Sequence, residues 1–83
     1  MEEPFVLEVD YKEIMHEYPA QLQMIGFTHR FIVTLPMLDL WFERDEEGSY
    51  RAIVPPGTDE KEVEMLDRNL IGAIAARIEA ILR

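Results

Sequence analysis

Histidine beside carboxylates is the pattern in this chain best suited to binding a metal ion or transferring a proton. His16 follows Glu13 by three positions and directly precedes Glu17, and His29 lies in a separate segment. A metal site would require the fold to bring further ligands to His16, because no second histidine is near it in the sequence. We expect His16 to be a solvated helix residue and His29 a partly buried strand residue. A small metal-binding protein or enzyme that uses Glu13, His16 and His29 is the alternative.

Other catalytic patterns are missing from the sequence. There is no cysteine, and Ser49 lies in a loop without the Gly-x-Ser-x-Gly turn of serine hydrolases. The four glycines are too far apart to form a phosphate-binding loop. Acid–base chemistry by a carboxylate pair needs one buried member, whereas the acids here occupy positions predicted to face solvent. We therefore expect no catalytic residue, no cofactor and no metal ion, and we favour a non-enzymatic function.

The net charge of −9 is concentrated in one part of the chain. Residues 39–67 carry ten acidic and three basic residues, a net charge of −7. This surface could bind a basic protein partner or imitate nucleic acid, and its alternative role is to keep the domain soluble. The charge argues against direct binding to nucleic acid or to an anionic membrane. We define the acidic belt as Glu43, Asp45, Glu46, Glu47, Asp59, Glu60, Glu62 and Glu64.

Length and composition indicate a single domain over residues 1–83. The start, Met1-Glu2-Glu3-Pro4, lacks the basic and apolar pattern of a secretory leader. The sequence has no apolar stretch of the roughly 20 residues that a membrane-spanning helix needs. Together with the lack of cysteine, these features lead us to expect a cytoplasmic protein.

Alternating apolar and polar residues predict three or four strands. The pattern covers residues 4–9, 27–35, 38–44 and 49–54. The last two strands flank an acidic loop in which Gly48 can adopt the positive φ that such loops require. We expect these strands to form an antiparallel sheet.

Helical spacing predicts one helix near the N-terminus and another at the C-terminus. Apolar residues recur at i, i+3, i+4 and i+7 over 11–18, after Asp10 as a cap. Residues 19–25 fit helix, strand or loop. The C-terminal helix extends over 58–82, either continuous or bent near Asp67. Its expected sheet-facing stripe consists of Leu70, Ile71, Ile74, Ile78, Ile81 and Leu82. We favour the bend, because Glu64 would otherwise fall inside that stripe. The predicted fold is α+β in the order β-α-β-β-β-α, with helices on one face of a three- to four-stranded antiparallel sheet.

Two further surfaces are candidates for protein contacts. Trp41 alternates with Leu40 and Phe42, so Trp41 is expected on the face opposite the core, and Tyr50 of the next strand with it. The helix face opposite the apolar stripe carries the small residues Gly72, Ala73, Ala76 and Ala80. A second copy packing on this smooth face would give a homodimer, and an exposed alanine-rich face is the alternative.

Two family resemblances accompany this pattern. Residues 42–50, followed by Val54-Pro55 and an acidic helix start, resemble the central hairpin of HicB-type antitoxins. That resemblance implies a protein that neutralises a small basic ribonuclease toxin, although the Leu-Pro-Gly-Cys-like turn and later strand of the family have no counterpart. The expected order over 11–82 resembles double-stranded RNA-binding domains, whose last helix begins with basic residues. Residues 58–62 are acidic instead, so this resemblance implies a shared fold without RNA binding.

These observations favour a small acidic, cytoplasmic, homodimeric protein-interaction module without enzymatic activity. The alternative is an acidic inhibitor, similar to an antitoxin, that blocks a basic nucleic-acid-binding partner.

Overall fold

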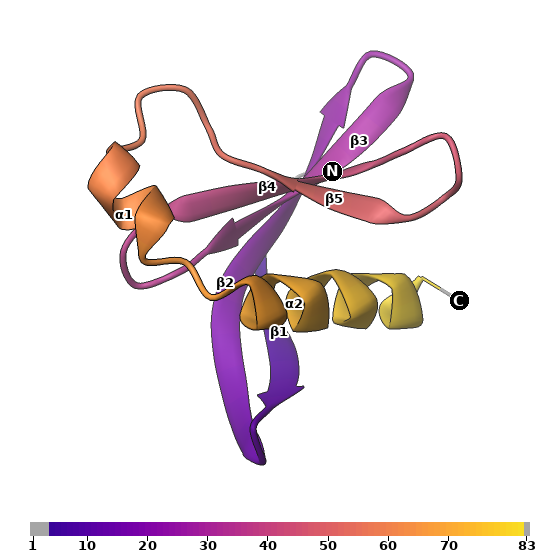
Figure 1. Ribbon diagram of the computed structural model, residues 1–83. Coiled ribbons are helices and arrows are strands. Elements are labelled where there is room, and N and C mark those ends of the chain that lie inside the picture. Colours follow the sequence, from indigo (N-terminus) through magenta and orange to yellow (C-terminus); the bar gives the residue numbers. More distant parts are fainter. Residues whose placement is uncertain (1–3, 83) are drawn as a thin grey trace.

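The computed structural model describes residues 4–82, which form a five-stranded antiparallel sheet followed by two helices (Figure 1). The elements are β1 (Pro4–Tyr11), β2 (Ile14–Ile25), β3 (Thr28–Thr34), β4 (Asp39–Arg44), β5 (Tyr50–Ile53), α1 (Glu60–Glu64) and α2 (Arg68–Ile81). Each strand pairs with the next one in the chain, giving the sheet order β1-β2-β3-β4-β5. Helix α2 contacts both edge strands, β1 and β5, so the sheet curls around it. The predicted α+β class with an antiparallel sheet is confirmed.

The predicted order β-α-β-β-β-α is wrong at its first helix. Residues 11–18 belong to a β-hairpin, in which Lys12 and Glu13 form a two-residue turn with positive φ angles of 53° and 65°. Positive φ at both positions produces a turn that matches the twist of the flanking strands. Residues 19–25, which the sequence left open, continue β2. The described chain therefore has five strands in place of the predicted three or four, and only the C-terminal helical region remains.

Strand β2 accommodates Pro19 because of the pairing pattern. The two-residue turn makes Tyr11 and Ile14 a hydrogen-bonded pair, and alternation along the ladder then leaves Val6 and Pro19 opposite each other without such bonds. The β2–β3 pairing begins one residue later, at Ala20. The missing N–H of proline therefore removes no ladder hydrogen bond.

The core lies between the curled face of the sheet and α2. Its buried hydrophobic residues are Leu7, Val9, Tyr18, Ala20, Phe31, Val33, Leu35, Leu38, Leu40, Phe42, Tyr50, Ile74 and Ile78. From α2, Ile74 and Ile78 are fully buried, and Leu70 and Ile71 pack at the edge of the core. The prediction was wrong for the end of the stripe, because Ile81 is 42% and Leu82 53% exposed. The last turn of α2 lies at the edge of the core, where Leu82 lines a hollow with Arg44 and Tyr50.

The expected interruption near Asp67 is confirmed. Asp59 caps α1 by accepting a hydrogen bond from the Lys61 backbone N, and Asp67 caps α2 by accepting one from the Asn69 backbone N. None of residues 60–64 is buried, so α1 is held at the edge of the core. No helix within residues 4–82 has the length and apolar character needed to cross a membrane.

Candidate functional site

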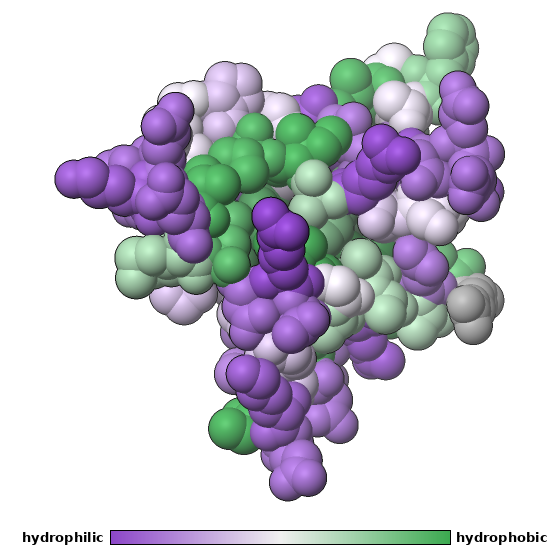
Figure 2. Space-filling model, viewed as in Figure 1, coloured by the Kyte–Doolittle hydropathy of each residue, from purple (hydrophilic) through white to green (hydrophobic). Residues whose placement is uncertain are grey.

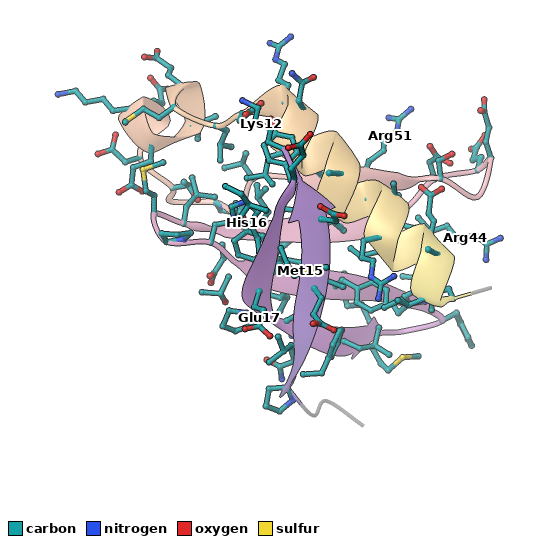
Figure 3. All side chains as sticks on the ribbon, turned by 90° about the horizontal axis from the view of Figure 1, so that it is seen from below. Lys12, Met15, His16, Glu17, Arg44 and Arg51 are labelled. Atoms are coloured by element: carbon teal, nitrogen blue, oxygen red, sulfur yellow. The ribbon has the colours of Figure 1, made fainter. Side chains whose placement is uncertain are left out.

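The histidines do not form a common site. His16 lies on the core side of β2 between the rings of Tyr11 and Tyr18, whose centroids are 6.2 and 6.0 Å away. It is a half-buried strand residue, which corrects the predicted solvated helix position. Glu17, the next residue of β2, is exposed, as alternation along a strand predicts, and Figure 3 labels both residues on this strand. Among the residues that the structure describes, no group of three or more histidines and acids is arranged to hold a metal ion.

His29 lies on β3, partly buried as predicted, and is linked to Tyr50. Its Nε2 atom is 2.6 Å from the Tyr50 hydroxyl oxygen, and the Tyr50 backbone N donates to Oε2 of Glu79 at 3.1 Å. Burial raises the pKa of the Tyr50 phenol; Arg44 nearby opposes this shift, and Glu79 adds to it. The phenol is therefore neutral at physiological pH.

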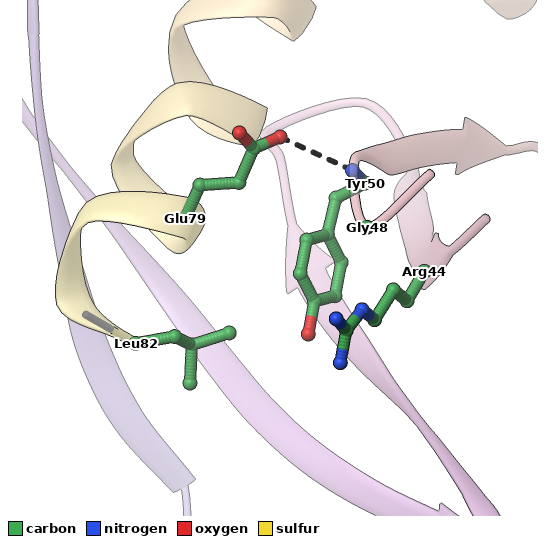
Figure 4. A pocket seen from close by; sticks show the side chains of 5 residues that line it. All are labelled: Arg44, Gly48, Tyr50, Glu79 and Leu82. Carbon is green, nitrogen blue, oxygen red and sulfur yellow. Dashed lines mark hydrogen bonds between the residues drawn. The ribbon is translucent and has the colours of Figure 1, made fainter. Parts of the chain in front are cut away.

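A hollow of about 270 Å³ adjoins this cluster (Figure 4). It is lined by Arg44, Gly48, Tyr50, Glu79 and Leu82. The polar groups of Tyr50 and Glu79 already bond to neighbours, so they tie the end of α2 to the start of β5. We interpret this cluster as a structural link between helix and sheet.

The acidic belt is divided between two elements and contains acids of two kinds. Three of its members have structural roles. Oε2 of Glu43 lies 3.0 Å from the Arg30 guanidinium, and Asp59 caps α1. Burial alone would raise the pKa of Asp45, but hydrogen bonds from the backbone N of Ser49 and of Glu47, together with Arg51, outweigh it and keep that pKa below its usual value.

The other belt acids have no such role in the described structure. Glu46 and Glu47 are exposed in the β4–β5 loop, and Glu60 and Glu64 are exposed on α1. Glu62, also on α1, is half-buried. These carboxylates are the part of the belt that remains able to contact a partner.

Trp41 lies on the sheet face opposite the core, as predicted, since its neighbours Leu40 and Phe42 are fully buried. The same expectation was wrong for Tyr50, which is buried in the core. The Arg30 guanidinium lies over the Trp41 ring, 3.9 Å from the centroid. Arg30 Nε is buried and has no hydrogen-bond partner among the described residues. Trp41 is therefore half-covered by its own chain.

An apolar hollow of about 480 Å³, which we call the β5 groove, opens beside β5. It is lined by Leu40, Ala52, Val54, Val63, Glu64, Leu66, Arg68 and Ile71. Figure 2 shows hydrophobic side chains gathered between α1, β5 and α2, with hydrophilic residues on either side. No pattern in the sequence indicated this groove, because its lining residues come from separate elements.

The small-residue face of α2 is only partly exposed. Gly72, Ala76 and Ala80 face solvent, whereas Ala73 packs against the core. Apart from the backbone of its own helix, no described atom lies within 4 Å of the position that a Cβ on Gly72 would occupy. Among residues 4–82, nothing therefore packs closely on Gly72.

Two features were not predicted from the sequence. The Tyr11 hydroxyl donates to Oδ2 of Asp67 at 2.5 Å, which anchors the β1–β2 hairpin to the start of α2. Lys12, at the hairpin turn, lies 3.9 Å from the same oxygen. Tyr11 and Asp67 are 56 positions apart in the chain, and nothing in the local sequence indicates their pairing.

The second feature is Phe27, at the tip of the β2–β3 hairpin, which is fully exposed.

Comparison with protein-family models, with curated proteins and with solved structures gives no match for this chain.

Proposed function

We propose that this chain is a small acidic protein-interaction module, without enzymatic activity of its own, that binds a basic protein partner in the cytoplasm. One observation carries the proposal: the exposed carboxylate of Glu64 stands at the border of an apolar hollow. Glu64 and its neighbour Val63 on α1 both line the β5 groove, and the exposed Arg68 is the other charged residue of its lining. An apolar centre with a charged rim is the usual composition of a protein-binding surface.

Charge complementarity would contribute mainly to the rate and selectivity of such binding. A protein with a net charge of −9 attracts a basic partner over a distance set by salt, about 10 Å at 0.1 M. The same charge disfavours nucleic acid and anionic membranes as direct ligands. A basic nucleic-acid-binding protein is one partner of this chemistry, and binding to it would make the module an inhibitor similar to an antitoxin. The observed strand–loop–strand form of β4 and β5 is consistent with the hairpin resemblance that suggested this role.

Charge reversal on the acidic belt tests the proposal. The double variant Glu60→Lys with Glu64→Lys should weaken binding of a lysine-rich peptide about tenfold, from two contacts of up to about 1 kcal/mol each. The matched control is Glu8→Lys with Glu17→Lys, which changes the net charge equally at exposed residues of β1 and β2. Fluorescence anisotropy at about 0.02 M and about 0.5 M salt gives both the affinity and its salt dependence. Equal losses in the two double variants would show that only net charge matters and would refute a defined acidic site.

The proposal includes a homodimer formed through the exposed part of the small-residue face of α2. A contact of this kind would place a second backbone near Gly72, where the described chain leaves space. Ala76→Arg should then give a monomer in analytical ultracentrifugation, whereas Met15→Arg, at an exposed position of β2, should not change the mass. An unchanged mass for Ala76→Arg would exclude this interface.

A further inference from the structure

The outer edge of β5 presents backbone hydrogen-bonding groups toward the β5 groove. Within residues 4–82, β4 is the one strand that pairs with β5. The Tyr50 backbone N donates to Glu79, on the side away from β4. Backbone groups two residues apart on a strand point the same way, so the N–H and C=O of Ala52 also point away from β4.

The two ends of this edge differ. At Tyr50, the edge is closed by the Glu79 carboxylate, which accepts the hydrogen bond that a neighbouring strand would otherwise accept. At Ala52 and Val54, the edge borders the β5 groove, and both residues are exposed. Pro55 and Pro56 follow immediately and limit the exposed edge to a short segment. The edge is thus available over about three residues.

The opposite edge of the sheet is protected. Strand β1 begins with Pro4 and carries the exposed acids Glu8 and Asp10. Proline and exposed charge are common means of preventing strand addition. Strand β5 carries the exposed Arg51, but Ala52, Ile53 and the following Val54 present no charged side chain. The two edges therefore differ in their capacity to accept another strand.

We propose that β5 binds an extended segment of the basic partner as an added strand. The segment hydrogen-bonds to the Ala52 backbone, places an apolar side chain in the β5 groove and brings a lysine or arginine to Glu64. Main-chain bonds supply affinity in this mode, and pockets for alternate side chains supply selectivity. The inference rests on the proposed function, because the basic partner is the occupant that a protein with a net charge of −9 attracts.

Three peptides of equal charge test this binding mode on the intact chain. The first peptide alternates valine and lysine. The second has the same sequence with every other backbone nitrogen methylated, and it is made in two forms, methylated at the valines or at the lysines. The third replaces valine with serine. Because N-methylation removes donors without changing charge, it should weaken binding at least about tenfold, as should the loss of valine. ¹⁵N-labelled protein should show slowed amide exchange at Ala52 only with the first peptide.

A protein variant provides an independent measurement. Val63→Glu places a charge in the β5 groove and should weaken binding of the valine–lysine peptide relative to the serine–lysine peptide. Val6→Glu, at an exposed position of β1, is the matched control and should weaken neither. Circular dichroism checks that both variants fold.

The outcomes separate the two proposals. If all three peptides bind equally and salt weakens each one, strand addition is wrong, while an acidic protein-binding module remains supported. If none binds at low salt, the proposed function fails and the strand-addition mode fails with it. Shifts confined to the Trp41 face would also overturn strand addition at β5.

Discussion

Two isoleucines on α2 provide a direct test of how the helix packs on the sheet. Ile78 is fully buried, whereas Ile81, three residues later, is 42% exposed. The same side-chain groups are removed when either is replaced with alanine, so the difference between the two variants mainly reports burial.

The expected loss of stability follows from the groups removed. Ile78→Ala deletes three buried carbon groups, each contributing about 0.8 kcal/mol, and the remaining cavity brings the loss into a range of about 2–5 kcal/mol. Ile81→Ala should cost about 1 kcal/mol or less, because much of that side chain is already in water. An 83-residue domain has a total stability of about 4–12 kcal/mol. Ile78→Ala therefore removes a large fraction of it.

Urea denaturation followed by circular dichroism measures both losses of stability. In thermal unfolding, a loss of about 3 kcal/mol should lower the melting temperature by roughly 12–24 °C. Equal losses for the two variants would refute the observed helix register. A larger loss at Ile81 would mean that α2 is rotated or shifted toward its C-terminus on the sheet.

Three further predictions concern the turn, a phenol and an edge contact. Glu13→Gly should stabilise the protein by about 1 kcal/mol in urea denaturation, because glycine adopts a φ of 65° without strain. The control Glu17→Gly, within β2, should destabilise the protein. A loss of stability in Glu13→Gly would contradict the turn geometry. The hydrogen bond to Asp67 is the main reason that the pKa of Tyr11 rises to about 12, so the fold favours the neutral phenol. This stabilisation is complete below pH 10 and is lost as pH rises toward 12. In an ultraviolet titration, Tyr11→Phe should remove a phenol that ionises near pH 12, and removal of one that ionises near pH 10 would refute this assignment. Glu79→Ala should lower the stability by about 1–2 kcal/mol, because it leaves the Tyr50 N–H without its acceptor. Glu79→Gln should retain most of the stability, because its amide oxygen can still accept this bond. Equal losses of stability in the two variants would show that the hydrogen bond is unimportant.

The central hairpin could be predicted because each local signal agrees. In β4, Leu40 and Phe42 alternate with polar or outward residues, and both are fully buried. Gly48 has a φ of 87°, as the loop requires. When alternation and turn chemistry indicate the same structure, sequence alone places the strands and their faces.

The first hairpin could not be predicted because its signals conflict. Tyr11, Ile14, Met15 and Tyr18 match a helical stripe, yet Ile14 and Met15 are 59% and 57% exposed in the structure. The turn between Tyr11 and Ile14 consists of Lys12 and Glu13. Lysine and glutamate rarely adopt positive φ, so these residues did not indicate a turn. Tertiary pairing, including the anchor from Tyr11, overrides the local pattern here.

The candidate site shows the same division. The acids of α1 were identified from composition, because charge is a property of the sequence. The β5 groove was not, because Ala52, Val63 and Ile71 come from three elements whose proximity exists only in the folded chain. Sequence reasoning thus finds residue chemistry and misses hollows between elements.

The position of α1 separates binding from folding in this protein. None of its residues is buried, whereas α2 supplies Ile74 and Ile78 to the core. Substitutions at Glu60 or Glu64 should therefore leave the stability nearly unchanged, as is usual for exposed positions outside caps and cores. A loss of binding in those variants then reports a lost contact with the partner, because the fold that carries α1 depends on residues elsewhere.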